Sequence, residues 1–164
     1  MQLIMIVYRT IYNFKPGLIE NLLKTSYKRL IDYFPNEKQR FYHQWENEDY
    51  EAFNNPDTIG KYVLFSCLGN NPIGYFSWDD RQFPLGIIGQ NCILPNYQGQ
   101  GYGRNQIESI IKIFQDKKFY EIRVITGNHD FFTASQKMYT NCGFQEKRKI
   151  EGDLFNLIEL TKQI

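Results

Sequence analysis

The sequence predicts an α/β fold, in the mixed α+β sense. We expect a central twisted sheet of about six or seven strands, mixed but mostly antiparallel, with about four helices flanking it. Three observations support this fold class. Short runs rich in Ile, Leu and Val alternate with stretches of helical periodicity along the 164 residues. Residues 69–72, Gly-Asn-Asn-Pro, are typical of a hairpin turn between two apolar runs. Residues 98–103 form a glycine-rich loop between an apolar run and a helical pattern.

The first third of the chain combines one strand with two helices. Residues 2–9 are rich in Ile, Leu and Val and predict a strand. Apolar residues at helical spacing predict an amphipathic helix over 18–31, which Pro35 brings to an end. A weaker helical pattern covers about 36–53 and is followed by a loop at 54–57.

The middle third consists mainly of strands. The pattern predicts strands at 62–68, 73–78 and 87–94, and the third of these leads into the glycine-rich loop. Residues 79–85 connect the last two strands. After the loop, apolar residues at spacings of i, i+3, i+4 and i+7 predict a helix over 102–117.

The last third places one further helix among strands. The predicted elements are a strand at 121–126, a helix at about 131–142 and strands at 144–150 and 154–160. Asp130 is in position to cap the start of the helix, and Gly143 is in position to end it. Residues 151–153, Glu-Gly-Asp, predict a tight turn between the last two strands.

Length, composition and charge narrow the classes of function. A chain of 164 residues without internal repeats or low-complexity segments predicts one domain, residues 1–164. The formal net charge of +1 supplies no global attraction for nucleic acid or a membrane, so neither partner is expected. The acidic stretch 44–60 contains no Lys or Arg, which indicates either a solvated face or attraction for a cationic substrate.

The cysteines and the N-terminal residues indicate the cellular compartment that we expect for the protein. Cys67, Cys92 and Cys142 are far apart in the chain, which predicts reduced thiols in a cytoplasmic protein. They form no CxxC or Cys/His spacing, so no metal site is expected. The apolar run 3–8 is too short to span a membrane and lacks the features of a signal peptide.

The loop at 98–103, Gln-Gly-Gln-Gly-Tyr-Gly, is the most informative stretch of the chain. At a strand–loop–helix junction, unpaired backbone N–H groups converge, and the positive end of the helix dipole lies behind them. This arrangement binds anions and suits a diphosphate, so a phosphate-bearing ligand is expected. A Walker loop is excluded because no Gly-Lys-Ser/Thr is present, and the GxGxG spacing departs from the dinucleotide fingerprint.

Two motifs occur in order in the second half of the chain. The first is the loop at 98–103 with Ile-Leu-Pro at 93–95 before it, and the second is Tyr-Thr-Asn-Cys-Gly-Phe at 139–144. With these motifs and the helix and strand between them, residues 58–160 resemble the GNAT superfamily of acetyl-CoA-dependent N-acetyltransferases. The resemblance implies the fold of that superfamily and acetyl-CoA as co-substrate, with no metal.

The chain departs from the superfamily pattern just before the second motif. Phe132 stands where many members have Asn, and Ser135 stands where they have Ala. Asn128 and Thr126 are the two candidates to replace the missing Asn. One hydrogen bond to the cofactor depends on this replacement, whereas the fold does not.

The resemblance also implies which residues contact the acyl-CoA. The pyrophosphate would bind the backbone N–H groups of 98–103, and pantetheine would lie beside residues 92–94, where the superfamily separates this strand from the next by a bulge. A backbone N–H within 91–93 would polarise the thioester carbonyl. The implied contacts are Asn91, Cys92, Ile93, Leu94, Gln98, Gly99, Gln100, Gly101, Tyr102, Gly103, Arg104 and Ser135.

The implied reaction is direct attack of a neutral primary amine on the acetyl thioester in a ternary complex. Tyr139 is the predicted acid for the leaving thiolate, because an ordinary tyrosine, with a pKa of about 10, is protonated at neutral pH. The alternative interpretation of Tyr139 is a buried residue with a locally satisfied hydroxyl. No general base stands out, and the candidates are Glu46, Asp79, Asp80 and His129.

The acceptor is a small-molecule or peptide amine that the sequence does not identify. The acidic stretch 46–57 favours a small polycationic amine over a peptide N-terminus. A monomer and a homodimer are both compatible with the sequence. A non-catalytic acyl-CoA-binding sensor or interaction module of the same fold is the alternative function, and turnover distinguishes the two.

Overall fold

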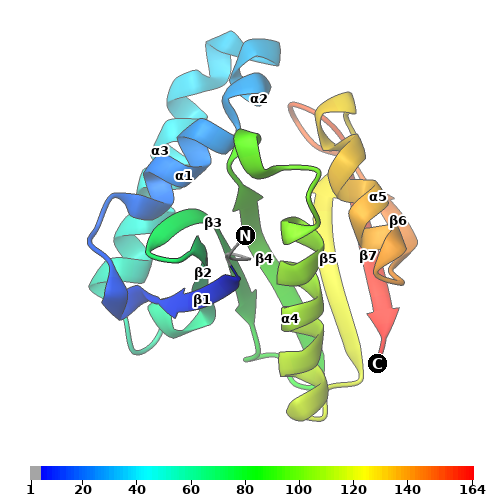
Figure 1. The fold of residues 1–164 in the computed structure, drawn as a ribbon. Coiled ribbons are helices and arrows are strands. Elements are labelled where there is room, and N and C mark those ends of the chain that lie inside the picture. The colour runs from blue at the N-terminus through cyan, green and yellow to red at the C-terminus, as the bar shows by residue number, and fades with distance from the viewer. Residues whose placement is uncertain (1–4) are drawn as a thin grey trace. The chain divides into compact units, whose positions relative to one another are not determined.

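The computed structural model describes residues 5–164 (Figure 1). Seven strands form one sheet within these residues. They are β1 (Ile6–Thr10), β2 (Val63–Leu68), β3 (Asn71–Asp79), β4 (Leu85–Ile93), β5 (Glu121–Gly127), β6 (Gln145–Ile150) and β7 (Leu157–Gln163). The α-helices are α1 (Leu18–Ser26), α2 (Lys28–Tyr33), α3 (Lys38–Asn54), α4 (Tyr102–Asp116) and α5 (Thr133–Asn141).

The sheet is mixed and mostly antiparallel, which confirms the predicted fold class. Its strand order is β1-β2-β3-β4-β5-β7-β6. β4 and β5 run parallel, whereas the pairs β1/β2, β2/β3, β5/β7 and β6/β7 run antiparallel. The described residues contain one α-helix more than predicted, because the helix predicted over 18–31 is divided.

The chain divides into two compact units. The first contains residues up to 77 together with 91–102, and the second contains residues 78–90 and 103–164. Strand β4 belongs to both units, because its first part lies in the second unit and its last part, from Asn91, lies in the first.

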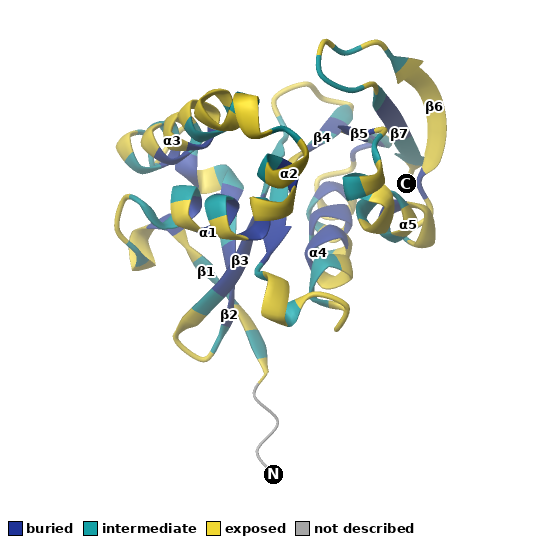
Figure 2. Cartoon of the chain, turned by 90° about the horizontal axis from the view of Figure 1, so that it is seen from above, coloured by how far each residue is buried: buried dark blue, intermediate teal, exposed yellow. Residues whose placement is uncertain are grey.

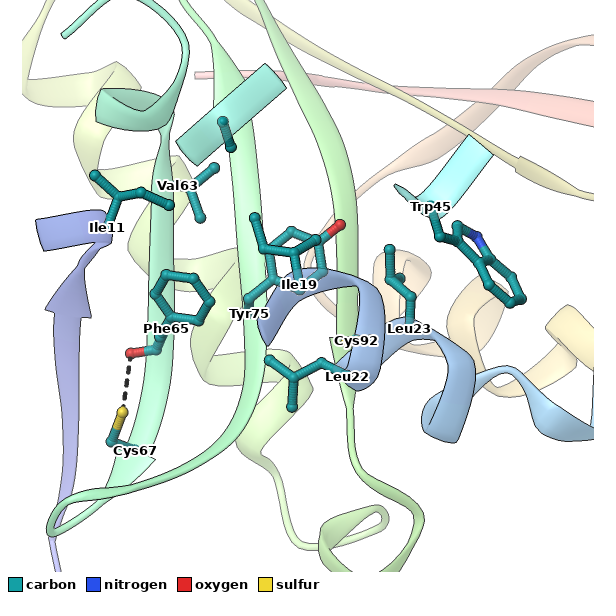
Figure 3. Packing of buried hydrophobic residues seen from close by; sticks show 11 residues of the cluster. Ile11, Ile19, Leu22, Leu23, Trp45, Val63, Phe65, Cys67, Tyr75 and Cys92 are labelled. Atoms are coloured by element: carbon teal, nitrogen blue, oxygen red, sulfur yellow. Dashed lines mark hydrogen bonds between the residues drawn. The ribbon is translucent and has the colours of Figure 1, made fainter. Parts of the chain in front are cut away.

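The core of the first unit is formed by α1, α3, β2 and β3 (Figure 3). On α1, the buried residues Ile19, Leu22 and Leu23 are three and four positions apart, so one face of the helix points into the core. Phe65 of β2 is fully buried, and the ring of Phe14 lies edge-on to it at a centroid distance of 4.8 Å.

Tyr27 divides the predicted helix 18–31 into α1 and α2. Its backbone angles, φ −103° and ψ 16°, lie outside the α-helical range. Its ring packs against Trp45 of α3 with centroids 5.8 Å apart, and its hydroxyl donates to the carbonyl oxygen of Asn91 at 3.1 Å. These contacts hold the tyrosine at the junction. The prediction of one continuous helix is therefore wrong at this residue, although both halves are helical.

The hairpin between β2 and β3 turns at Gly69 and Asn70, because Leu68 pairs directly with Asn71. Gly69 has a φ of +61°, which favours glycine. The turn is therefore confirmed, but it is two residues shorter than the predicted 69–72. The predicted strand 2–9 is confirmed from Ile6, and its residues 2–4 lie outside the described part of the chain.

Strand β5 organises the second unit. It pairs with β4 in parallel, where residues 85–87 face 121–123, and with β7 along its whole length. The centre of β7 is buried, whereas β6 is exposed over nearly all its length (Figure 2). Arg148 of β6 donates from Nε to Oε2 of Glu159 at 2.9 Å, and this pairs a carboxylate that is only 2% exposed.

The predicted helix over 102–117 is confirmed as α4. Its apolar stripe is buried, and Phe114 on that stripe is fully covered. A Cβ added to Gly86 would lie 2.6 Å from the Phe114 ring. Only glycine therefore allows this close approach between the ring and β4.

The predicted cap at Asp130 is wrong, because His129 takes that position. Nδ1 of His129 accepts a hydrogen bond from the N–H of Phe131 at 3.1 Å, at the start of a short 3₁₀ turn that precedes α5. The histidine side chain supplies the acceptor that Asp, Asn or Ser usually supplies at a helix start. Gly143 ends α5 with a φ of +89°, as predicted.

The last strand begins three residues later than predicted, at Leu157, and the connection is longer than the predicted turn at 151–153. Phe155 packs against Phe132 at a centroid distance of 5.3 Å, and the carbonyl oxygen of Asn156 accepts from the N–H of Asn128 at 2.7 Å. These contacts hold residues 151–156 as a loop. Among residues 5–164, none of the helices combines the length and the apolar composition that a membrane span requires.

Asp49 of α3 caps the start of α1 and is the basis of a first prediction. It is only 4% exposed, and its carboxylate accepts from the N–H groups of Gly17, Ile19 and Glu20 at 2.8, 2.9 and 3.2 Å. Replacing Asp49 by Ala leaves these donors without an acceptor. The free energy of unfolding should fall by about 2–3 kcal/mol, measured by urea denaturation.

Asp116→Ala is the matched control for this prediction. Asp116 lies on α4 and is exposed, and among the described residues it pairs only with Lys112. Its loss should change stability by less than about 0.5 kcal/mol. An Asp49→Ala variant as stable as this control would contradict the capping role.

Candidate functional site

The glycine-rich loop lies between the end of β4 and the start of α4. A 3₁₀ turn at Pro95–Tyr97 follows β4, and α4 begins at Tyr102. Gly99 and Gly101 have φ values of +73° and +89°, and a Cβ added to either would meet no atom within 4 Å. Glycine is therefore favoured at both positions by the positive φ of the backbone, whereas the space around them would admit a side chain.

The middle of this loop is exposed and has backbone donors without a backbone acceptor. Residues 98–101 are exposed, and within residues 5–164 the N–H groups of 99–101 donate to no backbone oxygen. The loop is held from behind, because Nε2 of Gln98 donates to the carbonyl oxygen of Ile93 at 2.8 Å. Nε2 of Gln100 donates to the carbonyl oxygen of Asn96 at 3.2 Å. Exposed N–H donors directly before a helix form a site suited to an anion.

Residues 91–94 lie beside β3 within the first unit. The N–H of Leu94 donates to the carbonyl oxygen of Ile73 at 2.7 Å. A Cβ on Gly74 would collide with the carbonyl oxygen of Cys92, so the two strands approach closely here. Burial raises the pKa of the Cys92 thiol to about 12. At neutral pH this thiol is protonated, which argues against a nucleophilic role.

The second motif forms the end of α5. Tyr139 is only 3% exposed, and its ring meets Phe144 edge-on at a centroid distance of 5.8 Å. The N–H of Phe144 donates to the carbonyl oxygen of Tyr139 at 3.1 Å, across the left-handed Gly143. Ser135 is half-buried on the same helix. The tyrosine and the Gly-Phe pair therefore build a helix terminus, and the acid role of Tyr139 stays a prediction.

The predicted site residues divide between the two units. Asn91, Cys92, Ile93, Leu94, Gln98, Gly99, Gln100, Gly101 and Tyr102 come together in the first unit. Gly103, Arg104, Ser135 and Tyr139 belong to the second. Arg104 is exposed and its Nε donates to Glu108 at 2.7 Å.

Phe132 has a structural role. Its ring packs on Phe155 and Phe131, and a Cβ on Gly127 would collide with it. An aromatic cluster therefore occupies this position. Of the two candidates for the missing polar contact, Asn128 is exposed and Thr126 is buried.

The four candidate bases all have structural partners. Asp79 accepts from Nε and Nη2 of Arg81 at 2.9 and 2.7 Å, and these bonds lower the pKa of its carboxyl. Asp80 pairs with Lys117, Glu46 lies 3.3 Å from Nζ of Lys24, and the His129 side chain caps a helical turn. The acidic stretch 46–57 is therefore not one continuous acidic surface, since Asp49 is also buried.

The structure adds Glu48, which sequence analysis did not single out. Its carboxylate accepts from the Tyr75 hydroxyl at 3.0 Å and from Nε2 of Gln44 at 3.5 Å. Burial raises the pKa of this carboxyl, and the two hydrogen bonds partly offset the rise. A signal was present, because position 48 continues the buried stripe of α3 formed by Trp45, Asp49 and Ala52. Within residues 5–164, no cluster of His, Cys, Asp and Glu is arranged to hold a metal ion.

Comparison with known families identifies the chain. The model of the acetyltransferase (GNAT) family matches residues 23–144. The chain belongs to the GNAT family. As a GNAT acetyltransferase, it is an acyltransferase, and the superfamily resemblance seen in the sequence is confirmed.

Solved structures share the GNAT fold at low sequence identity. A GNAT-family protein from Desulfovibrio desulfuricans has a TM-score of 0.75 and 11% identity, over 97% of this chain and 99% of its own. The PaiA N-acetyltransferase from Thermoplasma acidophilum, in complex with coenzyme A, has a TM-score of 0.68 and 16% identity, over 98% and 99%. A Bacillus subtilis acetyltransferase in complex with CoA has a TM-score of 0.56 and 15% identity, over 62% and 76%. No curated protein matches the sequence significantly.

Proposed function

We propose that this protein transfers an acetyl group from acetyl-CoA to a primary amine, by direct attack in a ternary complex. The observation that carries the proposal is the exposed loop at 98–101, whose glycine conformations present backbone N–H groups before α4. Two structural relatives, from Thermoplasma acidophilum and Bacillus subtilis, were crystallised with coenzyme A. These complexes support the choice of ligand.

In this proposal the backbone does most of the binding. The pyrophosphate accepts hydrogen bonds from N–H groups in 98–103, and pantetheine lies beside 92–94. A backbone N–H within 91–93 stabilises negative charge on the thioester oxygen during attack. Arg104 and Ser135 supply further contacts to the cofactor.

The chemistry requires two proton movements. The amine loses a proton and forms the C–N bond, after which the C–S bond breaks. Tyr139 donates a proton to the departing thiolate sulfur, and a positioned acid of this kind contributes ~10²–10⁴-fold. The burial of Tyr139 in the structure favours a second candidate function, a sensor that binds acyl-CoA without turnover.

Thermal unfolding with acetyl-CoA, ATP and NAD, each tested separately, examines the proposed ligand. Acetyl-CoA at about 100 times its dissociation constant should add ~2.7 kcal/mol and raise Tm by several degrees. Release of free thiol in the presence of spermidine, tyramine or a peptide with a free N-terminus would support the transferase. A shift without thiol release would support the sensor, and a shift with ATP or NAD alone would contradict both.

Gly101→Asp should abolish acetyl-CoA binding for two reasons. A side chain at this positive φ strains the backbone of the loop, and the negative charge of the carboxylate repels the pyrophosphate. Isothermal titration calorimetry measures the loss. Gly69→Asp is the matched control, since Gly69 also has a positive φ and open space around its Cβ position. Binding retained by Gly101→Asp would show that the diphosphate is held elsewhere.

Tyr139→Phe should lower kcat by at least ~10-fold while leaving acetyl-CoA affinity nearly unchanged, because only the proton donor is removed. Steady-state thiol release and calorimetry give the two quantities. Tyr120→Phe, at an exposed tyrosine of the same unit, is the control. Turnover equal to that of the unaltered protein would remove Tyr139 from the mechanism.

A further inference from the structure

Glu48 is a half-buried carboxylate without a cationic partner. Its neighbours are a hydroxyl and an amide, from Tyr75 on β3 and Gln44 on α3. Within residues 5–164, no Lys or Arg forms an ion pair with it. A carboxylate in such a position costs free energy unless a ligand compensates its charge.

Tyr75 connects Glu48 to the end of β4. The tyrosine is buried to 2% exposure, and Gly74 before it is in close contact with the carbonyl of Cys92. The Tyr75 hydroxyl donates to Glu48, and the backbone next to Tyr75 approaches β4 closely at Cys92. Tyr75 therefore links Glu48 to the strand segment that would hold the thioester.

Few other titratable groups surround Glu48. Burial raises the pKa of Tyr75 well above its ordinary value and that of Cys92 to about 12, so both are neutral between pH 5 and 9. Tyr27 contributes a hydroxyl that donates to the Asn91 carbonyl. On α3 itself, the oxygens of Asp49 accept from α1. Among these groups, Glu48 is the carboxylate whose pKa burial raises.

We propose that Glu48 is the general base that accepts the proton of the acceptor amine, with Tyr75 as the residue that positions its carboxylate. This inference rests on the proposed function. The ammonium group of the acceptor pairs with Glu48, and one N–H proton moves to a carboxylate oxygen, from which it passes to water. The freed nitrogen lone pair forms the C–N bond, and the C–S bond breaks afterwards. The departing thiolate takes its proton from Tyr139, and the second proton that the nitrogen loses goes to water, from which the Tyr139 hydroxyl is restored.

The environment of Glu48 suits this role. A base is most effective when its pKa lies near the working pH, and burial moves the pKa of Glu48 in that direction. The other candidates are less suitable, because Asp79, Asp80 and Glu46 are each paired with a cation.

Kinetics of Glu48→Gln test the proposal. With an amine that supports thiol release, kcat/KM for the amine should fall by ~100-fold or more, while calorimetric acetyl-CoA affinity stays within about twofold. Tyr75→Phe should lower kcat/KM for the amine by less than Glu48→Gln does, and it should shift the acidic limb of the pH profile to higher pH, because the hydrogen bond that positions Glu48 and lowers its pKa is lost. Glu37→Gln, at a glutamate before α3 that pairs with Arg40, is the control.

Thermal stability separates a base from a structural residue. The pKa of Glu48 is raised in the folded protein, so the folded state loses stability as pH rises from the ordinary value of 4.5 through the folded pKa. Glu48→Gln removes this loss, and its Tm at pH 7.5 should equal or exceed that of the unaltered protein. A structural glutamate would instead lower Tm when replaced.

Three outcomes decide between the hypotheses. Thiol release by Glu48→Gln at the unaltered rate overturns the role of Glu48 and leaves the proposed function in place. A lower Tm together with lost acetyl-CoA binding assigns Glu48 to structure and also overturns it. Failure of the unaltered protein to release thiol with spermidine, tyramine and the peptide overturns the proposed function, and this inference with it.

Discussion

The carboxylate of Asp49 fixes α3 to the start of α1, and the position of its neighbour Glu48 depends on this attachment. Three backbone N–H groups at the start of α1 donate hydrogen bonds to the two carboxylate oxygens of Asp49 on α3, and this carboxylate is buried. Gly17 offers no side chain at that helix start, so the cap has to come from elsewhere in the chain. The same turn of α3 thus carries one carboxylate for structure and another for the proposed chemistry.

The features that sequence predicted well are those encoded locally. The stripe of α4 and the glycines of the loop depend on spacing and on backbone freedom, which a sequence displays directly. The predictions of a continuous helix through Tyr27, of a cap at Asp130 in place of His129 and of a strand at Phe155 are wrong for one common reason. Tyr27 and Phe155 are held by partners distant in the chain, and His129 has a capping role that histidine seldom has. Local sequence patterns indicate neither a distant partner nor an unusual role. For Glu48, the spacing on α3 indicates a position facing the core, but its partner, the Tyr75 hydroxyl, lies 27 residues away and is seen only in the structure.

The second motif illustrates how one sequence pattern can serve fold and chemistry together. Gly143 ends α5, and Phe144 packs edge-on against the ring of Tyr139, so substitution of either would disturb the helix terminus. The same covering holds the tyrosine in one position, which a proton donor requires. Stability measurements on this motif therefore have to accompany any kinetic test of it.

The exposed strand β6 has a consequence for self-association. As the last strand of the sheet, it presents one edge that a strand of another molecule could extend. Its register with β7 shifts between Glu146 and Arg148, and Lys149 adds a charge there, whereas Lys147 and Arg148 pair with Glu121 and Glu159. An irregular ladder with a charged side chain is a poor template for a further strand, so the edge at β6 disfavours continuous sheets across molecules.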